Sequence, residues 1–167
     1  NQALKQMAAD YGCPDDLKCT GLFASGTNDT TFGDVFVKYF NVAKNCKTVG
    51  GLHCWEDETN YNYDGTYKGS NAKYDSDEGY KFITADGMSF WIQNFANNCL
   101  TDGTGGSTNY STGRTGNMKQ TCGSIAIDIN GLKKPNAYGR DTFIFLITNG
   151  KGATLYPRGG ADDKYNN

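Results

Sequence analysis

Residues 125–145 read IAIDINGLKKPNAYGRDTFIF, and this stretch decides the fold that we predict from the sequence. An apolar run of alternating pattern stands at each end, with the period of two that is typical of β-strands. Positions 128–141 between the runs hold two Asp, two Asn, two Gly and one Pro. Because these residues favour turns, the stretch predicts two antiparallel strands joined by a structured polar loop.

The same period of two extends over residues 80–157. Asp86-Gly87 stands between two of the alternating runs, which is a hairpin signal. The strands predicted in this region are 80–84, 88–95, 123–129, 141–148 and 153–156. Residues 101–117 between them are rich in Gly, Ser, Thr and Asn, and we expect them to form a flexible loop.

Helical spacing dominates the first part of the chain. Residues 1–11 carry one apolar stripe, and a second stripe with a Thr31–Asp34 capping box runs from Phe32 to Asn45. Helices followed by an antiparallel meander predict an α+β fold, with the N-terminal helices packed on one face of the sheet.

Length and composition indicate one domain. At 167 residues with 22 Gly and a hydrophobic fraction of 37%, the chain suits a modest core under long loops. We divide it into a helical part (1–45), a long loop region (46–79), the sheet (80–157) and a polar tail (158–167). The net charge of −2 comes without any basic run, so we expect no nucleic-acid contact.

The even number of cysteines, six, predicts disulfides and an oxidising compartment. The sequence has no CxxC pair, so a structural zinc site is not indicated. Six cysteines allow fifteen pairings. Sequential pairing closes the shortest loops, so we favour Cys13–Cys19, Cys46–Cys54 and Cys99–Cys122. Each bridge would contribute roughly 2–3.5 kcal/mol in the loop-entropy description.

The chain starts at Asn1 and has no apolar run of membrane-spanning length. We therefore expect that a signal or anchor has been removed from this segment.

The loop over positions 128–141 is the candidate metal site. It offers oxygen ligands for calcium from four side chains, which are those of Asp128, Asn130, Asn136 and Asp141. The alternative is a hairpin loop whose Asn and Asp side chains bond to their own backbone, and Lys133 and Lys134 would repel a cation. Calcium is a possible ligand, and we expect no required cofactor. The short acidic runs 56–58 and 75–78 read as solvated loop faces.

Enzymatic motifs are absent from the sequence. His53 is the only histidine and precedes a cysteine, so we expect no catalytic residues and no enzyme activity. Aromatic residues in the loops could contact a sugar or protein partner or could anchor the loops; they are Trp55, Tyr61, Tyr63, Tyr67 and Tyr74.

Several short segments together resemble the C-terminal region of the bacterial type IV pilin and pseudopilin superfamily. They are 83–87 (ITADG), 122–131 (CGSIAIDING), 134–136 (KPN), 139–145 (GRDTFIF) and 152–157 (GATLYP). The likeness is most specific over residues 80–157. The apolar N-terminal helix of about twenty residues that defines the family is missing from this chain.

The resemblance implies a structural subunit of an extracellular filament, either a pilus or a secretion pseudopilus. It implies partners that are other copies or other pilins, and a precursor held in the bacterial inner membrane only through the missing helix. The competing hypothesis is a secreted calcium-dependent module that binds carbohydrate or protein. A small secreted hydrolase is a third possibility.

Overall fold

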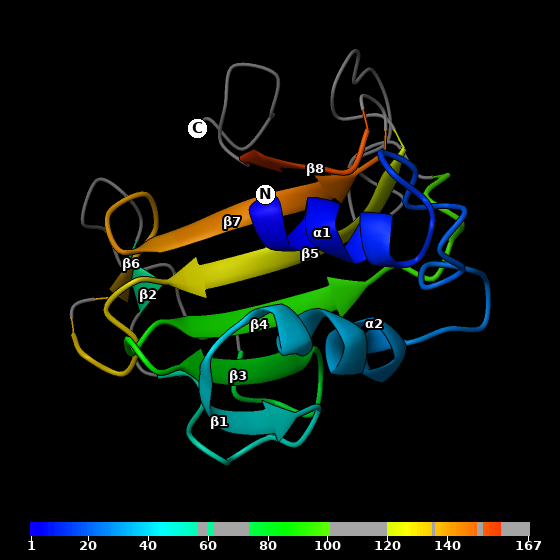
Figure 1. Ribbon diagram of the computed structural model, residues 1–167. Helices are drawn as coiled ribbons and strands as arrows, with labels where there is room; N and C mark the ends of the chain where they lie inside the picture. Colours follow the sequence, from blue (N-terminus) through cyan, green and yellow to red (C-terminus); the bar gives the residue numbers. More distant parts are fainter. Residues whose placement is uncertain (57–59, 62–73, 101–119, 135, 150–151, 158–167) are drawn as a thin grey trace.

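A computed structural model describes residues 1–56, 60–61, 74–100, 120–134, 136–149 and 152–157 of the chain. Its main element is one six-stranded sheet in the order β1-β3-β4-β5-β7-β8, in which all neighbours are antiparallel (Figure 1). The strands are β1 (Val42–Lys47), β3 (Tyr80–Thr84), β4 (Ser89–Asn94), β5 (Thr121–Asp128), β7 (Thr142–Thr148) and β8 (Thr154–Pro157). A separate parallel pair joins β2 (Asn60–Tyr61) to β6 (Asn136–Ala137).

The predicted strands of the second half are confirmed, each within two residues at either end. The hairpin between β3 and β4 turns at Asp86-Gly87, where Gly87 has a φ of 90° and donates its N–H to the Thr84 carbonyl at 2.9 Å. A positive φ is available to Gly at little cost, which explains the Asp-Gly turn.

The expected α+β class is wrong. The structure is mostly antiparallel β-sheet, and the helices in its described part are too short to form a layer on that sheet. They are α1 (Gln2–Asp10), α2 (Asp29–Phe36) and the single 3₁₀ turn η1 (Val37–Tyr39).

The helix predicted up to Asn45 accounts for most of this error. Asn28, not Thr31, caps α2, and its side chain accepts the Thr31 N–H at 2.9 Å. The helix ends at Phe36, and Phe40 is already extended, with φ −128° and ψ 150°. Residues 42–47 then pair with β3 as an edge strand, because the sheet offers them hydrogen bonds that outweigh helical propensity.

The main core lies on the face of the sheet that carries α1 and α2, which are drawn in front of the strands in Figure 1. Its centre is a chain of touching aromatic rings, with centroids 4.7–5.2 Å apart; the rings are Phe23, Phe32, Phe36, Phe40, Phe82 and Phe90. Leu4, Met7 and Ala8 of α1 are fully buried in the same core. The aromatic residues expected in a helix are therefore core residues even where the helix has ended.

A smaller cluster covers the opposite face of the sheet. Trp55 and Tyr74 pack with centroids 4.7 Å apart over Ala126 of β5, and Trp91 of β4 touches Tyr74. Both Trp55 and Tyr74 are buried, so they anchor the segment before β3 to the sheet. The Tyr61 side chain, Tyr63 and Tyr67 lie outside the described residues, as do the predicted loop 101–117 and the tail 158–167.

Three disulfides join the cysteines in the sequential pairing, Cys13–Cys19, Cys46–Cys54 and Cys99–Cys122. This prediction is confirmed. Disulfides persist in oxidising compartments, so they indicate a secreted or extracellular location. Within the part of the chain that the structure describes, none of the helices has the length and apolarity needed to cross a bilayer.

Candidate functional site: the β5–β7 connection

The connection between β5 and β7 is held at its base by the two strand ends. Asp128 is the last residue of β5, and Asp141 directly precedes β7. The Ile129 N–H donates to the Asp141 carbonyl at 2.9 Å, which extends the ladder by one step. The rest of the connection folds back over this base, and its residues 136–137 form β6. The base therefore brings both acidic residues of the loop to one place.

Asp128 is completely buried. Its Oδ1 accepts the Asn130 N–H at 3.1 Å, the Asx turn that the sequence allowed. Burial raises the pKa of Asp128 to about 6, and the nearby Asp141 carboxylate adds to the rise. The backbone N–H groups of Asn130 and Gly131 donate to Asp128 and oppose this rise in pKa. The net shift shows that burial is only partly offset by the donors.

Asp141 is 5% exposed and lies on the other side of the base. One oxygen, Oδ1, accepts the Ala137 N–H at 2.5 Å, and Oδ2 lies 3.3 Å from the Asn130 amide nitrogen. With Asn136, which is also buried, the four residues predicted as a calcium site lie together. The structure thus brings these four residues together at the base of the connection.

The Asn136 amide decides between two interpretations of this cluster. Its Oδ1 faces only acceptors, namely the Lys133 carbonyl and Oδ2 of Asp128. Turning the amide by 180° places Nδ2 there instead, and it then donates to these oxygens at 3.0 and 3.1 Å. In the first orientation three oxygens converge without a hydrogen between them, an arrangement that a cation stabilises. In the second, the loop is satisfied by its own hydrogen bonds.

Ser89 is a fifth polar residue at this place, and sequence reasoning missed it. It is the first residue of β4 and pairs directly with Asp128 across the sheet, so both side chains lie on the same face. Ser89 is completely buried, and its hydroxyl has no hydrogen-bond partner among the residues that the structure describes. Only the strand order β4-β5 reveals this neighbour, because the two residues are 39 positions apart.

Close packing fixes the loop against the β3–β4 hairpin. Gly131 has a φ of 62°, and a β-carbon at this position would lie 2.1 Å from the Gly87 carbonyl oxygen and 3.6 Å from the Ser89 hydroxyl. Only glycine fits such an approach with this backbone conformation. The Asn-Gly pair of the sequence thus places the loop directly beside Ser89.

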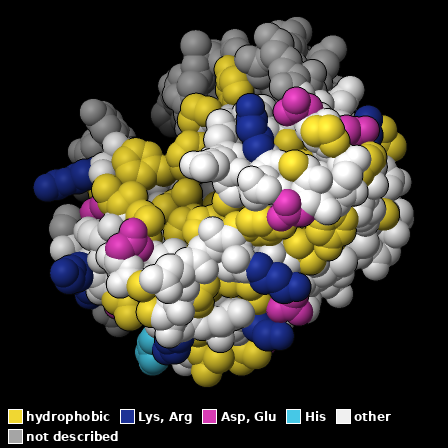
Figure 2. Space-filling view, in the orientation of Figure 1, with side chains coloured by type: hydrophobic (Ala, Val, Ile, Leu, Met, Phe, Trp, Pro, Cys, Tyr) yellow, Lys and Arg dark blue, Asp and Glu magenta, His cyan; other side chains and the backbone are white. Residues whose placement is uncertain are grey.

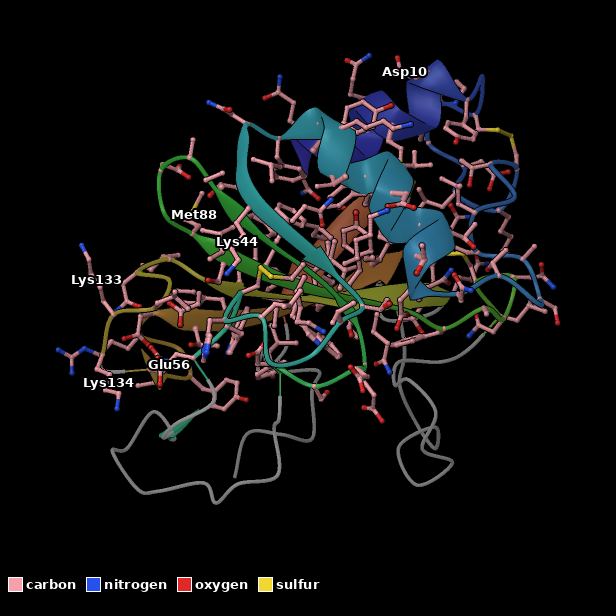
Figure 3. All side chains as sticks on the ribbon, turned by 90° about the horizontal axis from the view of Figure 1, so that it is seen from below. Asp10, Lys44, Glu56, Met88, Lys133 and Lys134 are labelled. Atoms are coloured by element: carbon pink, nitrogen blue, oxygen red, sulfur yellow. A yellow bond between two sulfur atoms is a disulfide. The ribbon has the colours of Figure 1, made fainter. Side chains whose placement is uncertain are left out.

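The donor set of this cluster suits a hard cation such as calcium, since it consists of carboxylate, amide, hydroxyl and carbonyl oxygens. The buried hydroxyls of Ser89 and Thr142 have no hydrogen-bond partner among the described residues, and a cation would satisfy such oxygens. Lys133 and Lys134, which the sequence suggested would repel a cation, are exposed and project away from the body of the protein (Figure 3). A bound ion would therefore be held by the side chains of Asp128, Asp141, Asn130, Asn136 and Ser89.

The acidic residues of the run 75–78 accept hydrogen bonds from the backbone of a neighbouring loop. Asp77 accepts the Gly50 N–H at 2.8 Å, and Asp75 accepts the N–H of His53 at 3.1 Å. They fasten the Cys46–Cys54 loop to the turn before β3. Among the described residues, no group of three or more His, Cys, Asp or Glu side chains could hold a metal ion. Asp57 and Glu58 lie outside this part of the chain.

The chain matches no protein-family model, no curated protein and no solved structure. Any assignment of function therefore rests on the residues and their geometry.

Proposed function

We propose that this domain is a structural subunit of an extracellular type IV pilus-like filament or pseudopilus, assembled by self-association. The observation that carries the proposal is the motif of residues 122–145, which resembles the C-terminal region of pilins and pseudopilins. In the structure this motif makes β5, the polar base of the connection and most of β7. The residues of the resemblance are thus the ones that hold the centre of the sheet together.

The three disulfides also support an extracellular structural role. Each one closes a short segment, and the Cys99–Cys122 bridge ties the end of the β4 region to the start of β5. Cross-links of this kind restrict the unfolded chain and preserve a surface exposed to harsh conditions. The partners under this proposal are other copies of the chain or related subunits, and the precursor is anchored in the inner membrane of a bacterium through a preceding apolar helix.

Immunogold labelling of the source cells tests this proposal. Antibodies raised against the 167-residue domain should decorate filaments, and the intact mass of the native protein should include an apolar helix that starts at a methylated residue. Protein found only in the medium, with a mature N-terminus near Asn1 and no labelled filament, would refute it.

A calcium-dependent binding module is the second candidate, and the two buried carboxylates of Asp128 and Asp141, gathered with Asn136 and Ser89, favour it. Calcium should raise the Tm of the domain, and Asp128→Asn should abolish this rise because it removes one of the two buried charges. Asp75→Asn serves as the matched control, since Asp75 is outside the cluster and should keep the calcium response. Glycan arrays with calcium and with chelator then test for a ligand. Equal melting curves in calcium and in chelator leave the hydrogen-bonded loop as the correct interpretation.

A further inference from the structure

We propose that two opposite ends of the domain bind each other in neighbouring copies of this chain, so that copies associate head to tail. This inference rests on the proposed function as a self-associating subunit and names the surfaces involved. The first surface, the loop end, comprises residues 129–134 and 136–140 of the β5–β7 connection. The second surface, the turn end, comprises Asp10, the last residue of α1, and residues 11–20, which follow this helix.

The loop end combines exposed apolar and basic side chains. Ile129 is 51% exposed and Leu132 is 43% exposed, which is unusual for two large apolar residues on one short loop. The basic side chains Lys133, Lys134 and Arg140 are exposed around them, while both acidic residues of the connection are buried at its base. Figure 3 shows Lys133 and Lys134 at one extremity of the molecule.

The turn end has the opposite charge. Asp10, Asp15 and Asp16 are exposed, and Lys18 is the only basic residue among residues 10–20. Tyr11 is 43% exposed between these carboxylates. An exposed tyrosine beside carboxylates can pack against leucine and isoleucine and can lie over a lysine or arginine. The two ends are thus complementary in charge and in apolar content.

The two surfaces lie at opposite ends of β7. The loop end leads into β7 through Asp141, whereas Asn149 directly follows the other end of the strand. Asn149 holds the turn end, because its Oδ1 accepts the Leu17 N–H at 2.6 Å and its Nδ2 donates to Asp16 at 3.0 Å. Contacts between different patches at opposite ends repeat from copy to copy, and they form an open filament wherever the rotation between copies does not close a ring.

Both surfaces are held in shape before they bind. The loop end stands on the buried cluster around Asp128, and the Cys13–Cys19 disulfide closes the turn end. Preorganised surfaces lose less conformational entropy on association.

Figure 2 shows apolar side chains gathered at the left of the view, around a hollow. Asp86 adds a negative charge near the loop end, because it adjoins Gly87, against which Gly131 packs. The attraction therefore depends on the exposed Lys133, Lys134 and Arg140.

A charge swap tests the inference. One variant reverses the charge of the loop end through Lys133→Glu and Arg140→Glu. The other reverses the charge of the turn end through Asp10→Lys and Asp15→Lys. Sedimentation at low ionic strength should show that wild-type copies associate and that each variant alone associates at least about tenfold more weakly, because like charges then face each other. An equimolar mixture of the two variants should regain association, since every contact in it again joins opposite charges.

Lys44→Glu, a charge reversal at an exposed position of the edge strand β1 and outside both surfaces, is the matched control and should associate like the wild type. Melting curves of every variant verify that it is folded. Failure of the mixture to regain association, with both variants folded, would overturn the inference. If the antibody labels filaments but the mixture does not regain association, only the choice of these two surfaces is wrong. If the mixture regains association but no filaments are labelled, only the proposed function is wrong.

Discussion

The amide nitrogen of Asn130 lies 3.3 Å from Oδ2 of Asp141, and this contact spans the connection between β5 and β7. The backbone N–H of the same Asn130 donates to Oδ1 of Asp128 at 3.1 Å. Asn130 thus stands as a neutral, donating residue between two buried carboxylates. Whether a negative charge can be tolerated at position 130 depends on what else occupies the cluster.

Asn130→Asp should separate the metal-binding loop from the hydrogen-bonded loop. In chelator the variant loses a donor to Asp141 and gains a third negative charge, so it should be less stable than the wild type by about 1–3 kcal/mol. In saturating calcium the additional carboxylate becomes a ligand, and the gain in Tm should exceed that of the wild type. Thermal unfolding in chelator, calcium and magnesium measures both effects.

Asn130→Ala is the control for this experiment, since it removes the donor without adding charge. It should lose stability in chelator and show no increased response to calcium. If calcium raises the Tm of neither the wild type nor Asn130→Asp, the cluster binds no calcium and the self-bonded loop is correct.

The raised pKa of Asp128 predicts an unusual pH dependence in chelator. A pKa of about 6 in the folded state, against 3.8 for an ordinary aspartate, means that the folded protein binds the proton more tightly than the unfolded chain does. The contribution of Asp128 to stability is therefore greatest below about pH 4, falls as the pH rises to about 6, and is constant above that value. Urea unfolding at intervals across this window measures the slope.

Asp128→Asn provides the comparison at each pH. The slope between about pH 4 and 6 should be shallower in this variant than in the wild type, because the group that takes up the proton is gone. Calcium should have a similar effect on the wild type, since a bound cation favours the charged carboxylate. Identical slopes in wild type and variant would show that Asp128 does not titrate in this range.

Local patterns in the sequence were sufficient to predict that four polar residues of one loop lie together, but not which residues surround them. Asp128, Asn130, Asn136 and Asp141 could be grouped because they share one short connection whose turn residues bend it back on itself. Ser89 could not be found in this way. Its place beside Asp128 depends on the pairing of β4 with β5, which is a property of the sheet and not of any local stretch.

The same limit explains the error in fold class. Residues 32–45 have apolar side chains at helical spacing, yet the helix ends at Phe36 and residues 42–47 join the sheet. The local pattern identified the core residues Phe36 and Phe40 correctly, because burial of these side chains is satisfied in either conformation. Edge-strand pairing with β3 decided the backbone, and that contact joins residues about forty positions apart.

Loss of the Cys99–Cys122 disulfide should destabilise the domain more than loss of Cys13–Cys19. The sequence separations are 23 and 6 residues, so the loop-entropy description gives roughly 3.5 and 2.4 kcal/mol. Both cysteines of the longer loop are completely buried, and their removal also leaves unfilled space. Paired Cys→Ala variants compared by urea unfolding measure the difference. A larger loss for the shorter loop would show that local strain or packing outweighs chain entropy here.

Lys81 of β3 is a buried lysine that no pattern in the sequence predicted. Its side chain is completely buried, and Nζ donates to the carbonyl oxygens of Ser76, Glu78 and Gly79 at 2.5, 3.1 and 3.1 Å. The ammonium group thereby holds together the turn that leads into β3. Removing it leaves the buried Gly79 carbonyl and the partly buried Ser76 carbonyl without this donor, which carries a desolvation cost, whereas the Glu78 carbonyl still accepts from Trp91.

Lys81→Met should therefore lower the free energy of unfolding by about 1–3 kcal/mol, despite the gain from burying an apolar chain of similar length. Lys47→Met is the matched control, because Lys47 pairs with Lys81 across β1 and β3 but is 55% exposed and forms only a surface ion pair with Asp34 at 3.2 Å. Such pairs contribute about 0–1 kcal/mol. Equal losses in the two variants would show that the carbonyl contacts of Lys81 add nothing beyond an ordinary surface lysine, whereas a larger loss for Lys81→Met assigns the difference to the turn.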